Sequence, residues 1–553
     1  MKALTKTNSE VFYFYLPFLI IVFIGSYLRL DQFAVQVLLD DEWHAVHQLI
    51  KGQPEKLFQT FSHADFSVPL ALLYWIQLKL FGLSETGMRW PMMLAGISTL
   101  VVFPLYIRKF FDDKTTLVFS LLLAISPLLI IYSRTARPYS LTLLLSIMAL
   151  AAFNHYVAAE KSPWKPGLSY FACAILSVWL HLITLPLVVA PFLTVGIPAL
   201  LARNWTRLRR ILWLALITAM VLFTLVLPPL LSHPEILGSK LGIHTPELAT
   251  FYGAFFTWLG TPSLNVFLLG MALAVLGASR LWRGFPLIFG LLTGLGLTLG
   301  VILLTQPQWV NHSLTLARYL LPMVPLLLLS ISLGVSQFSD VLVSHWGGRG
   351  TLLVWALLGA ALILTVYASP LHKILARPNS NSLHLVYQFD FRKEHNLVDQ
   401  YQQSFPLSPF WQLLASSPRG SLKIAASPFY FETYHWDAPR WEQISGQRVM
   451  PGYLTGLCVE HRWGEVPDGD GFRFQNVGYV GDPSDLAKRG FDLVVFQKPV
   501  KTMTTQGEVE LGKGTRACDK AHRKLYPEPV YEDEWLVAFP LSEKVRSQVD
   551  AER

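Results

Sequence analysis

Residues 11–30 read VFYFYLPFLIIVFIGSYLRL, an apolar run with no charge before Arg29. A helix of about 20 apolar residues is long enough to cross the hydrocarbon core of a bilayer. The run is too long for the apolar core of a signal peptide, and no small-residue cleavage site follows it. We therefore expect a retained membrane span, and a chain that folds in a membrane.

The composition extends this expectation to most of the chain. Of its 553 residues, 52% are hydrophobic and only 15% are charged, and the mean hydropathy is +0.40. Ten more candidate spans follow the first, at 88–107, 116–133, 139–158, 167–183, 184–201, 211–230, 264–280, 284–304, 319–336 and 351–368. The pattern predicts a polytopic α-helical membrane protein with about eleven transmembrane helices.

Basic residues on alternate loops predict the orientation. They are Lys2, Lys6, Arg108, Lys109, Lys161, Lys165, Arg203, Arg207, Arg209, Arg210, Arg280 and Arg283. Basic loops of membrane proteins face the cytoplasm, so the first outer loop, 31–87, and everything after about residue 370 lie outside. The net charge of +8 is then mainly an orientation signal, and no zinc-finger or basic-helix pattern indicates a nucleic acid partner.

The sequence predicts two domains, a transmembrane domain over 1–370 and a soluble periplasmic α/β domain over 371–553. In the second, apolar runs shorten and turn-rich pieces such as ASSPRGS and VPDGDG separate them. We expect helices in SPFWQLLAS and DPSDLAKRG, strands in SLKIAAS and FDLVVFQ, and one final strand in PVYEDEWLVAFP. Cys458 and Cys518 lie in this domain, and spacing alone leaves a disulfide between them open.

Three adjacent carboxylates, Asp40, Asp41 and Glu42, stand in LLDDEWHAVHQLIKG, residues 38–52. Asp40 or Asp41 can cap a short amphipathic helix lying on the membrane. Its apolar positions recur at helical spacing, at Ala45, Val46, Leu49 and Ile50. Adjacent carboxylates raise one another's pKa, which is unfavourable unless a cation, a metal or a proton-accepting role offsets it. Asp41 and Glu42 are therefore candidate catalytic residues.

Two more polar groups lie on the predicted outer side. His63 and Asp65, in FSHADFSVPLALLYW, are compatible with a divalent metal site or with a hydrogen-bonded turn. Arg134 and Arg137 in YSRTARPYS and Arg318 in LARYLLPMVP stand at outer ends of spans, where a basic residue opposes the positive-inside bias. They indicate an anionic partner, either lipid headgroups or the phosphate of a lipid-linked substrate. His181 is either part of the same site or a packing residue.

An ordered set of motifs resembles bacterial integral-membrane glycosyltransferases of the GT-C class, related to protein O-mannosyltransferases and to the aminoarabinose transferases that modify lipid A. The resemblance covers about residues 10–335. Its motifs are Asp41-Glu42, His63-Ala64-Asp65 followed by VPLALLYW, SETGMRWPMMLAG through Arg89, AISPLLIIYSRTARPYSLTLLL, and ARYLLPMVP. The sequence departs from the family pattern at Thr135, where relatives carry an acidic or amide residue, and at Val68-Pro69, where they carry a double proline.

The resemblance implies transfer of a sugar from a polyprenyl-phosphate carrier, with inversion, at the periplasmic face of the bacterial inner membrane. It implies Asp41 as the general base or as a group that positions the acceptor, and it leaves Glu42 either structural or holding an acceptor or an ion. His63, Asp65, Arg134, Arg137, Tyr139 and Arg318 are implied to bind substrate. The acceptor is a glycan, a lipid or a protein, no redox or nucleotide cofactor is required, and a divalent metal is compatible with the site.

Two other functions share these features. A polymerase or ligase of lipid-linked glycans also needs outer arginines, but usually carries them in a large late loop. A flippase or transporter of a lipid-linked sugar should bring charges inward along several spans, and matching broken helices should mark its repeats. The spans here contain few charges, and we find no such pair of broken helices.

Overall fold

The computed structural model describes residues 8–31, 33, 42, 58, 67–81, 85–159, 164–232, 241–367, 371, 406–427, 437–451, 483–488, 490–504, 507–511, 523–526, 528–543 and 545–547. The predictions made for Asp40, Asp41, His63, Asp65, Cys458 and Cys518 lie outside these residues. The amphipathic helix expected at 45–50 also lies outside them. The boundary between the two domains, at residues 370 and 371, stays a prediction.

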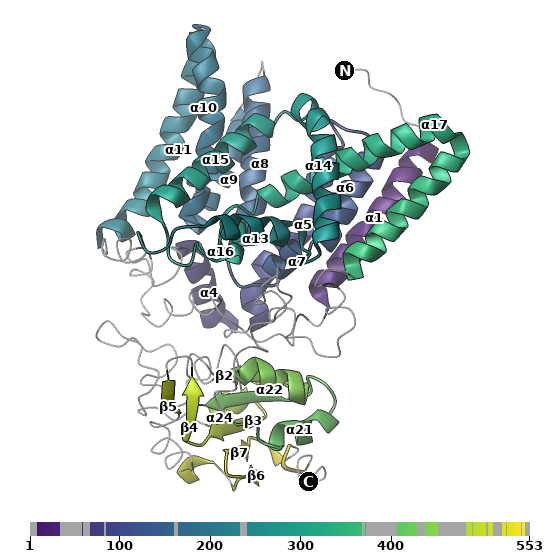
Figure 1. Ribbon diagram of the computed structural model, residues 1–553. Coiled ribbons are helices and arrows are strands. Elements are labelled where there is room, and N and C mark those ends of the chain that lie inside the picture. The colour runs from purple at the N-terminus through teal and green to yellow at the C-terminus, as the bar shows by residue number, and fades with distance from the viewer. Residues whose placement is uncertain are drawn as a thin grey trace.

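A bundle of long apolar helices forms the first two thirds of the protein (Figure 1). In the part of the chain that the structure describes, eight helices are long and apolar enough to cross a membrane, and the bent pair α6–α7 makes nine if it counts as one span. The helices are α1 (Asn8–Leu30), α4 (Val68–Phe81), α5 (Glu85–Ile107), α6 (Asp113–Ile125), α7 (Pro127–Ser133), α8 (Tyr139–Ala158), α9 (Trp164–Leu180), η2 (Leu182–Thr184), α10 (Leu185–Leu201), α11 (Trp205–Ser232), α13 (Leu248–Leu259), α14 (Leu264–Gly284), α15 (Ile288–Thr305), α16 (Ser313–Tyr319) and α17 (Met323–Tyr367). Each of the eleven predicted spans overlaps one of them, which confirms a polytopic helical protein.

The span predicted at 116–133 is broken at Ser126-Pro127, where α6 and α7 meet at 58°. Proline has no backbone N–H, so it leaves the carbonyl four residues earlier without its helical donor. Here the guanidinium of Arg29, from α1, donates to the Leu123 and Ala124 carbonyl oxygens at 3.2 and 3.1 Å. A buried arginine from a neighbouring helix thus compensates for the break.

The two last predicted spans, 319–336 and 351–368, both fall mainly on α17. Gly347 interrupts this helix with φ 55° and ψ −131°, a backbone conformation that residues with a side chain rarely adopt. Figure 1 shows two arms of α17 on either side of a sharp turn. Arg318 lies before the first arm, on the separate short helix α16.

The C-terminal part is an α/β unit, as predicted. Its five-stranded sheet has the order β2-β1-β3-β7-β6, with β2, β1 and β3 parallel and β7 antiparallel to both neighbours. In Figure 1 the sheet lies beyond the end of the bundle at which α4 lies. Its elements are α21 (Phe410–Leu413), η3 (Leu414–Ser416), β1 (Lys423–Ser427), α22 (Ala438–Ser445), β2 (Arg448–Pro451), α24 (Pro483–Lys488), β3 (Leu493–Gln497), β6 (Tyr531–Glu532) and β7 (Leu536–Pro540), with a separate hairpin of β4 (Val500–Thr504) and β5 (Gly507–Leu511).

The prediction of one final strand over PVYEDEWLVAFP was wrong. The segment forms two paired strands, β6 and β7, joined by a tight turn. Asp533 makes this turn, because its Oδ1 accepts hydrogen bonds from the backbone N–H groups of Trp535 and Leu536, each at 2.8 Å. Beside the sheet the buried rings of Trp411 and Trp441 stack with centroids 4.9 Å apart.

Candidate functional site

The centre of the site is a buried ion pair between Glu42 and Arg89. Both side chains are fully buried, and Arg89 on α5 donates from Nε to Oε1 and from Nη2 to Oε2, each at 2.8 Å. The backbone N–H of Ala136 donates to the same Oε1 at 2.6 Å. The sequence left Glu42 open between a structural and a substrate-holding role. Its carboxylate joins residue 42 to α5 and to the turn between α7 and α8.

Helix α4 supports this cluster through Tyr74. The buried hydroxyl of Tyr74 donates to the Met88 carbonyl at 3.0 Å and lies 3.5 Å from the Ala136 carbonyl oxygen. At 14 residues, α4 is about 21 Å long and too short to span the bilayer. Burial raises the pKa of Tyr74, and the negative charge of Glu42 raises it further. The hydroxyl is therefore a neutral donor at physiological pH.

Arg134 lies where α7 ends and holds the end of α1. Its Nη1 donates to the carbonyl oxygens of Arg29 and Asp31, at 2.7 and 2.6 Å, and its side chain is completely buried. Carbonyls at a helix C-terminus need donors from outside the helix. The Nη1 atom of Arg134 thus binds backbone, and substrate binding by Arg134 stays a prediction.

Arg137 and Arg318 meet at Tyr139, although they come from distant parts of the chain. The guanidinium carbons lie 5.8 and 5.6 Å from the centre of the Tyr139 ring, close enough for cation–π attraction. Arg137 Nη2 lies 3.5 Å from the Tyr139 hydroxyl oxygen. His181 joins them with its ring 5.6 Å from Tyr139 and 6.0 Å from Tyr319. The structure therefore brings together Arg137, Arg318 and Tyr139, which were predicted to bind substrate, with His181, whose role was left open, and Tyr319, which was not predicted.

A small cavity begins at this cluster, with Tyr139, Arg318 and Tyr319 in its wall. Four residues with hydroxyl groups, Thr142, Ser146, Thr184 and Thr298, also line it. Each hydroxyl donates to a nearby backbone carbonyl and keeps its capacity to accept a hydrogen bond. Hydroxyl and guanidinium groups are suited to a polar or anionic ligand. The cavity is therefore the part of the described site most suited to a phosphate or a sugar.

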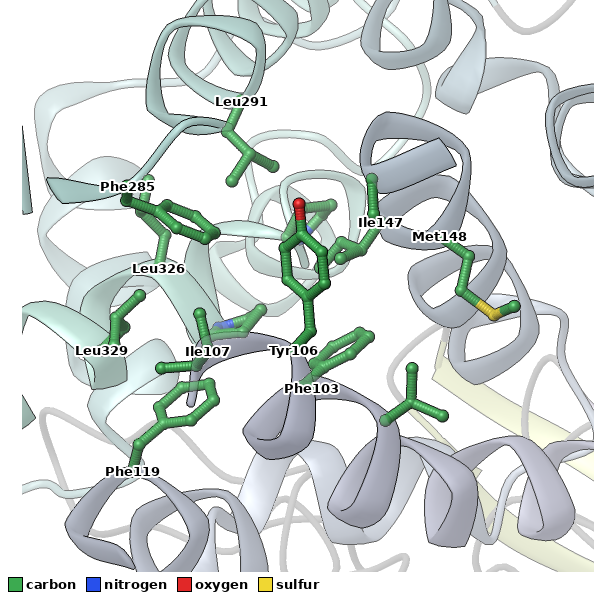
Figure 2. A pocket seen from close by; sticks show the side chains of 14 residues that line it. Phe103, Tyr106, Ile107, Phe119, Ile147, Met148, Phe285, Leu291, Leu326 and Leu329 are labelled. Carbon is green, nitrogen blue, oxygen red and sulfur yellow. The ribbon is translucent and has the colours of Figure 1, made fainter. Parts of the chain in front are cut away.

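A second pocket, of about 540 Å³, is almost entirely apolar. Figure 2 shows Tyr106 between Phe285 on one side and Ile147 and Met148 on the other. Pro322 lines both this pocket and the hydroxyl-lined cavity. Such a pocket suits a hydrocarbon chain and not a sugar.

The structure leaves part of the predicted site without a test. Asp41, His63 and Asp65 lie outside the described residues, so the base and the divalent metal stay predictions. Among the residues that are described, no three His, Cys, Asp or Glu side chains gather as a metal site would require.

No role was predicted for Arg89, although it lies in one of the family motifs, and none was predicted for Tyr74 or Tyr319. Arg89 carried a signal, because a lone arginine in an apolar helix needs a partner. Nothing in the sequence marked which acidic residue that partner would be.

Comparison with known proteins supports the relation predicted from the motifs. Residues 67–230 match the family described as dolichyl-phosphate-mannose-protein mannosyltransferase, a segment that contains Tyr74, Arg89, Arg137 and His181. This match confirms the predicted relation to membrane glycosyltransferases of the mannosyltransferase type. A comparison with curated proteins found no match.

Two solved structures of ArnT from Cupriavidus metallidurans are similar along most of the chain. The apo form has 13% sequence identity and a TM-score of 0.45, and the match covers 97% of this chain and 99% of that one. The form bound to undecaprenyl phosphate has 14% identity and a TM-score of 0.44, with 98% and 99% covered.

Proposed function

We propose that this protein is a glycosyltransferase that moves a sugar from a polyprenyl-phosphate carrier to an acceptor at the periplasmic face of the bacterial inner membrane. The observation that carries the proposal is the meeting of Arg137 and Arg318 at Tyr139, beside a hydroxyl-lined cavity. A guanidinium group can donate two parallel hydrogen bonds to two oxygens of one phosphate. The adjoining apolar pocket suits part of the carrier's hydrocarbon chain.

The reaction needs one base and a stabilised leaving group. In the proposed step Asp41 takes the proton from the acceptor hydroxyl, whose oxygen forms a bond to the anomeric carbon from the side opposite the phosphate. The bond between that carbon and the phosphate oxygen breaks, and the electron pair leaves with the polyprenyl phosphate. Arg137 and Arg318 stabilise the charge on this leaving phosphate as it develops. Attack from the opposite side inverts the anomeric centre.

Release of free polyprenyl phosphate from defined polyprenyl-phosphate sugars tests this function. The purified protein is incubated with one donor at a time and a mixture of envelope glycans, lipids and proteins, and both the lipid product and the labelled acceptor are followed. Transfer of one sugar with release of the carrier supports the proposal. Transfer of a preassembled glycan would indicate the polymerase or ligase, and movement of intact donor across vesicles would indicate the flippase.

Substitution of Asp41 by asparagine tests the base. The amide has nearly the same shape but cannot take a proton, so we expect turnover to fall at least about 100-fold, within the range that general base catalysis supplies. Asp40→Asn is the matched control, because Asp40 lies next to Asp41 in the chain and is predicted only to cap a helix. Full activity in Asp41→Asn protein that expresses and inserts normally would remove Asp41 from the mechanism.

A further inference from the structure

We propose that Glu42 is a positioning residue whose carboxylate joins the segment carrying Asp41 to the turn carrying Arg137, and that Arg89 keeps it in place. The inference rests on the proposed function and deepens it. Among the roles that the sequence left open for Glu42, which were catalytic, structural, or holding an acceptor or an ion, it favours the structural one. We call the group formed by Glu42, Arg89 and the Ala136 N–H the carboxylate clamp.

The hydrogen bonds that the Glu42 carboxylate accepts argue against a role for Glu42 as the general base. Oε1 accepts from both Arg89 Nε and the Ala136 N–H, and Oε2 accepts from Arg89 Nη2. To receive a proton, Glu42 would have to give up its charge beside a fully buried arginine. An uncompensated buried charge is strongly destabilising. Glu42 is therefore suited to stay ionised through the reaction.

The clamp reaches both halves of the proposed chemistry through chain connectivity. Asp41 precedes Glu42 in the sequence and Arg137 follows Ala136, so each clamped residue is the chain neighbour, about 3.8 Å away between Cα atoms, of a residue proposed for the reaction. Arg134 fixes the same turn from its other side by binding the carbonyls at the end of α1. Catalytic groups must be held within a fraction of an ångström of their working positions. In the proposed role, one carboxylate anchors the chain next to both the proposed base and the proposed phosphate-binding arginine.

The test compares Glu42→Gln, Arg89→Gln and the double variant in the carrier-release assay. Each single variant leaves one member of the pair without its partner, so we expect kcat to fall about thirtyfold and the KM for the donor to rise. The double variant replaces the ion pair by two amides, and we expect it to recover about tenfold in kcat over either single variant. The low-pH limb of the rate profile, which reports the base, should keep its midpoint in all three variants.

The control is Asp113→Asn, which breaks the Arg108–Asp113 ion pair at the other end of α5 and should leave kcat and KM unchanged. Rates are measured well below the unfolding midpoint of each variant, so that loss of folded protein does not contribute. A lost low-pH limb in Glu42→Gln, with no recovery in the double variant, would make Glu42 the base and overturn the clamp. If wild-type protein releases no carrier, the proposed function fails. The clamp is then judged by thermal unfolding alone. Unfolding midpoints that fall in both single variants and recover in the double variant still support it as a structural joint.

Discussion

Arg134 and Arg137 stand three residues apart on the same turn, yet their surroundings differ. Arg134 donates hydrogen bonds to the backbone at the end of α1, whereas Arg137 lies against Tyr139 with Arg318 close to the same ring. The two arginines are therefore suited to different roles, and the groups that surround each one decide which role it has. We propose that Arg134 holds the turn and that Arg137 and Arg318 bind the phosphate.

The two arginines should respond differently to alanine. Arg137→Ala removes charge-assisted hydrogen bonds to phosphate, worth about 1.5–3 kcal/mol, so the KM for the donor should rise about 10- to 100-fold. Arg134→Ala leaves two buried carbonyls without this donor and should instead lower the unfolding midpoint. Donor kinetics and thermal unfolding in detergent measure both. An unchanged donor KM in Arg137→Ala would remove Arg137 from the phosphate site.

At the scale of elements, α14 and α17 approach each other closely because both carry glycine at the contact. A Cβ atom on Gly277 would overlap the Ser330 carbonyl oxygen, and one on Gly334 would overlap that of Leu273. The Ser330 hydroxyl donates to the Ala274 carbonyl at 2.7 Å across the same contact. Small residues and hydroxyl groups are what membrane helices use to pack tightly, since lipid supplies no hydrophobic force between them.

Gly277→Leu should therefore separate these helices and destabilise the bundle by at least about 1–3 kcal/mol, the usual cost of overpacking. Gly296→Leu on α15 is the matched control, because a Cβ atom there meets nothing within 4 Å. Thermal unfolding in detergent compares the two. Equal midpoints for the two variants would contradict the close packing of α14 against α17.

The strand pair β6–β7 carries a charge whose effect depends on pH. Glu532 accepts from Arg523 at 3.0 and 3.2 Å and lies 2.9 Å from Lys498 Nζ. The hydrogen bonds from Arg523 and Lys498 lower the pKa of Glu532 below its ordinary value of 4.5. A carboxylate whose pKa is depressed on folding stabilises the folded state above its unfolded pKa, and this contribution is lost as pH falls through the folded pKa.

Glu532→Gln should accordingly reduce the loss of stability on acidification below about pH 4.5, because the amide does not titrate. The measurement is the unfolding midpoint of the C-terminal part of the whole protein as pH is lowered from 7. Glu543→Gln, at a carboxylate that is 89% exposed, is the control and should follow the wild-type curve. Parallel curves for all three proteins would show that the Glu532 ion pairs do not act on stability.

At the scale of the whole molecule, the start of α1 and the C-terminal sheet lie at opposite ends of the bundle (Figure 1). The basic residues predicted to be cytoplasmic include Arg203, in the turn between α10 and α11, and Arg207, in the first turn of α11. The positive-inside rule then predicts a periplasmic sheet on the side of the Glu42 cluster.

Alkaline phosphatase fusions test this orientation, because the enzyme needs disulfides that form only outside the cytoplasm. We expect high phosphatase activity for a fusion after residue 553 and low activity for one after Asn204. The reverse pattern would place the proposed site in the cytoplasm and exclude a periplasmic reaction.

The sequence predicted the helices most closely where local signals were strongest. The span expected at 139–158 matches α8, Tyr139–Ala158, which begins directly after a proline. The break at Ser126-Pro127, within the span expected at 116–133, was not predicted. Both sides of Ser126-Pro127 are apolar, so a hydropathy pattern does not register this break. Gly347, by contrast, lies between the two spans expected at 319–336 and 351–368.

The sequence by itself determined that the chain spans a membrane many times and ends in an α/β unit. The bilayer demands apolar segments of a set length, which is a local requirement that a run of residues meets or fails alone. Only the tertiary structure decided that Glu42 pairs with Arg89, 47 residues away, and with the Ala136 N–H, 94 residues away. It also decided that Arg137 and Arg318 share Tyr139. Such partners depend on how helices pack, and no local pattern encodes which of several buried charges will meet.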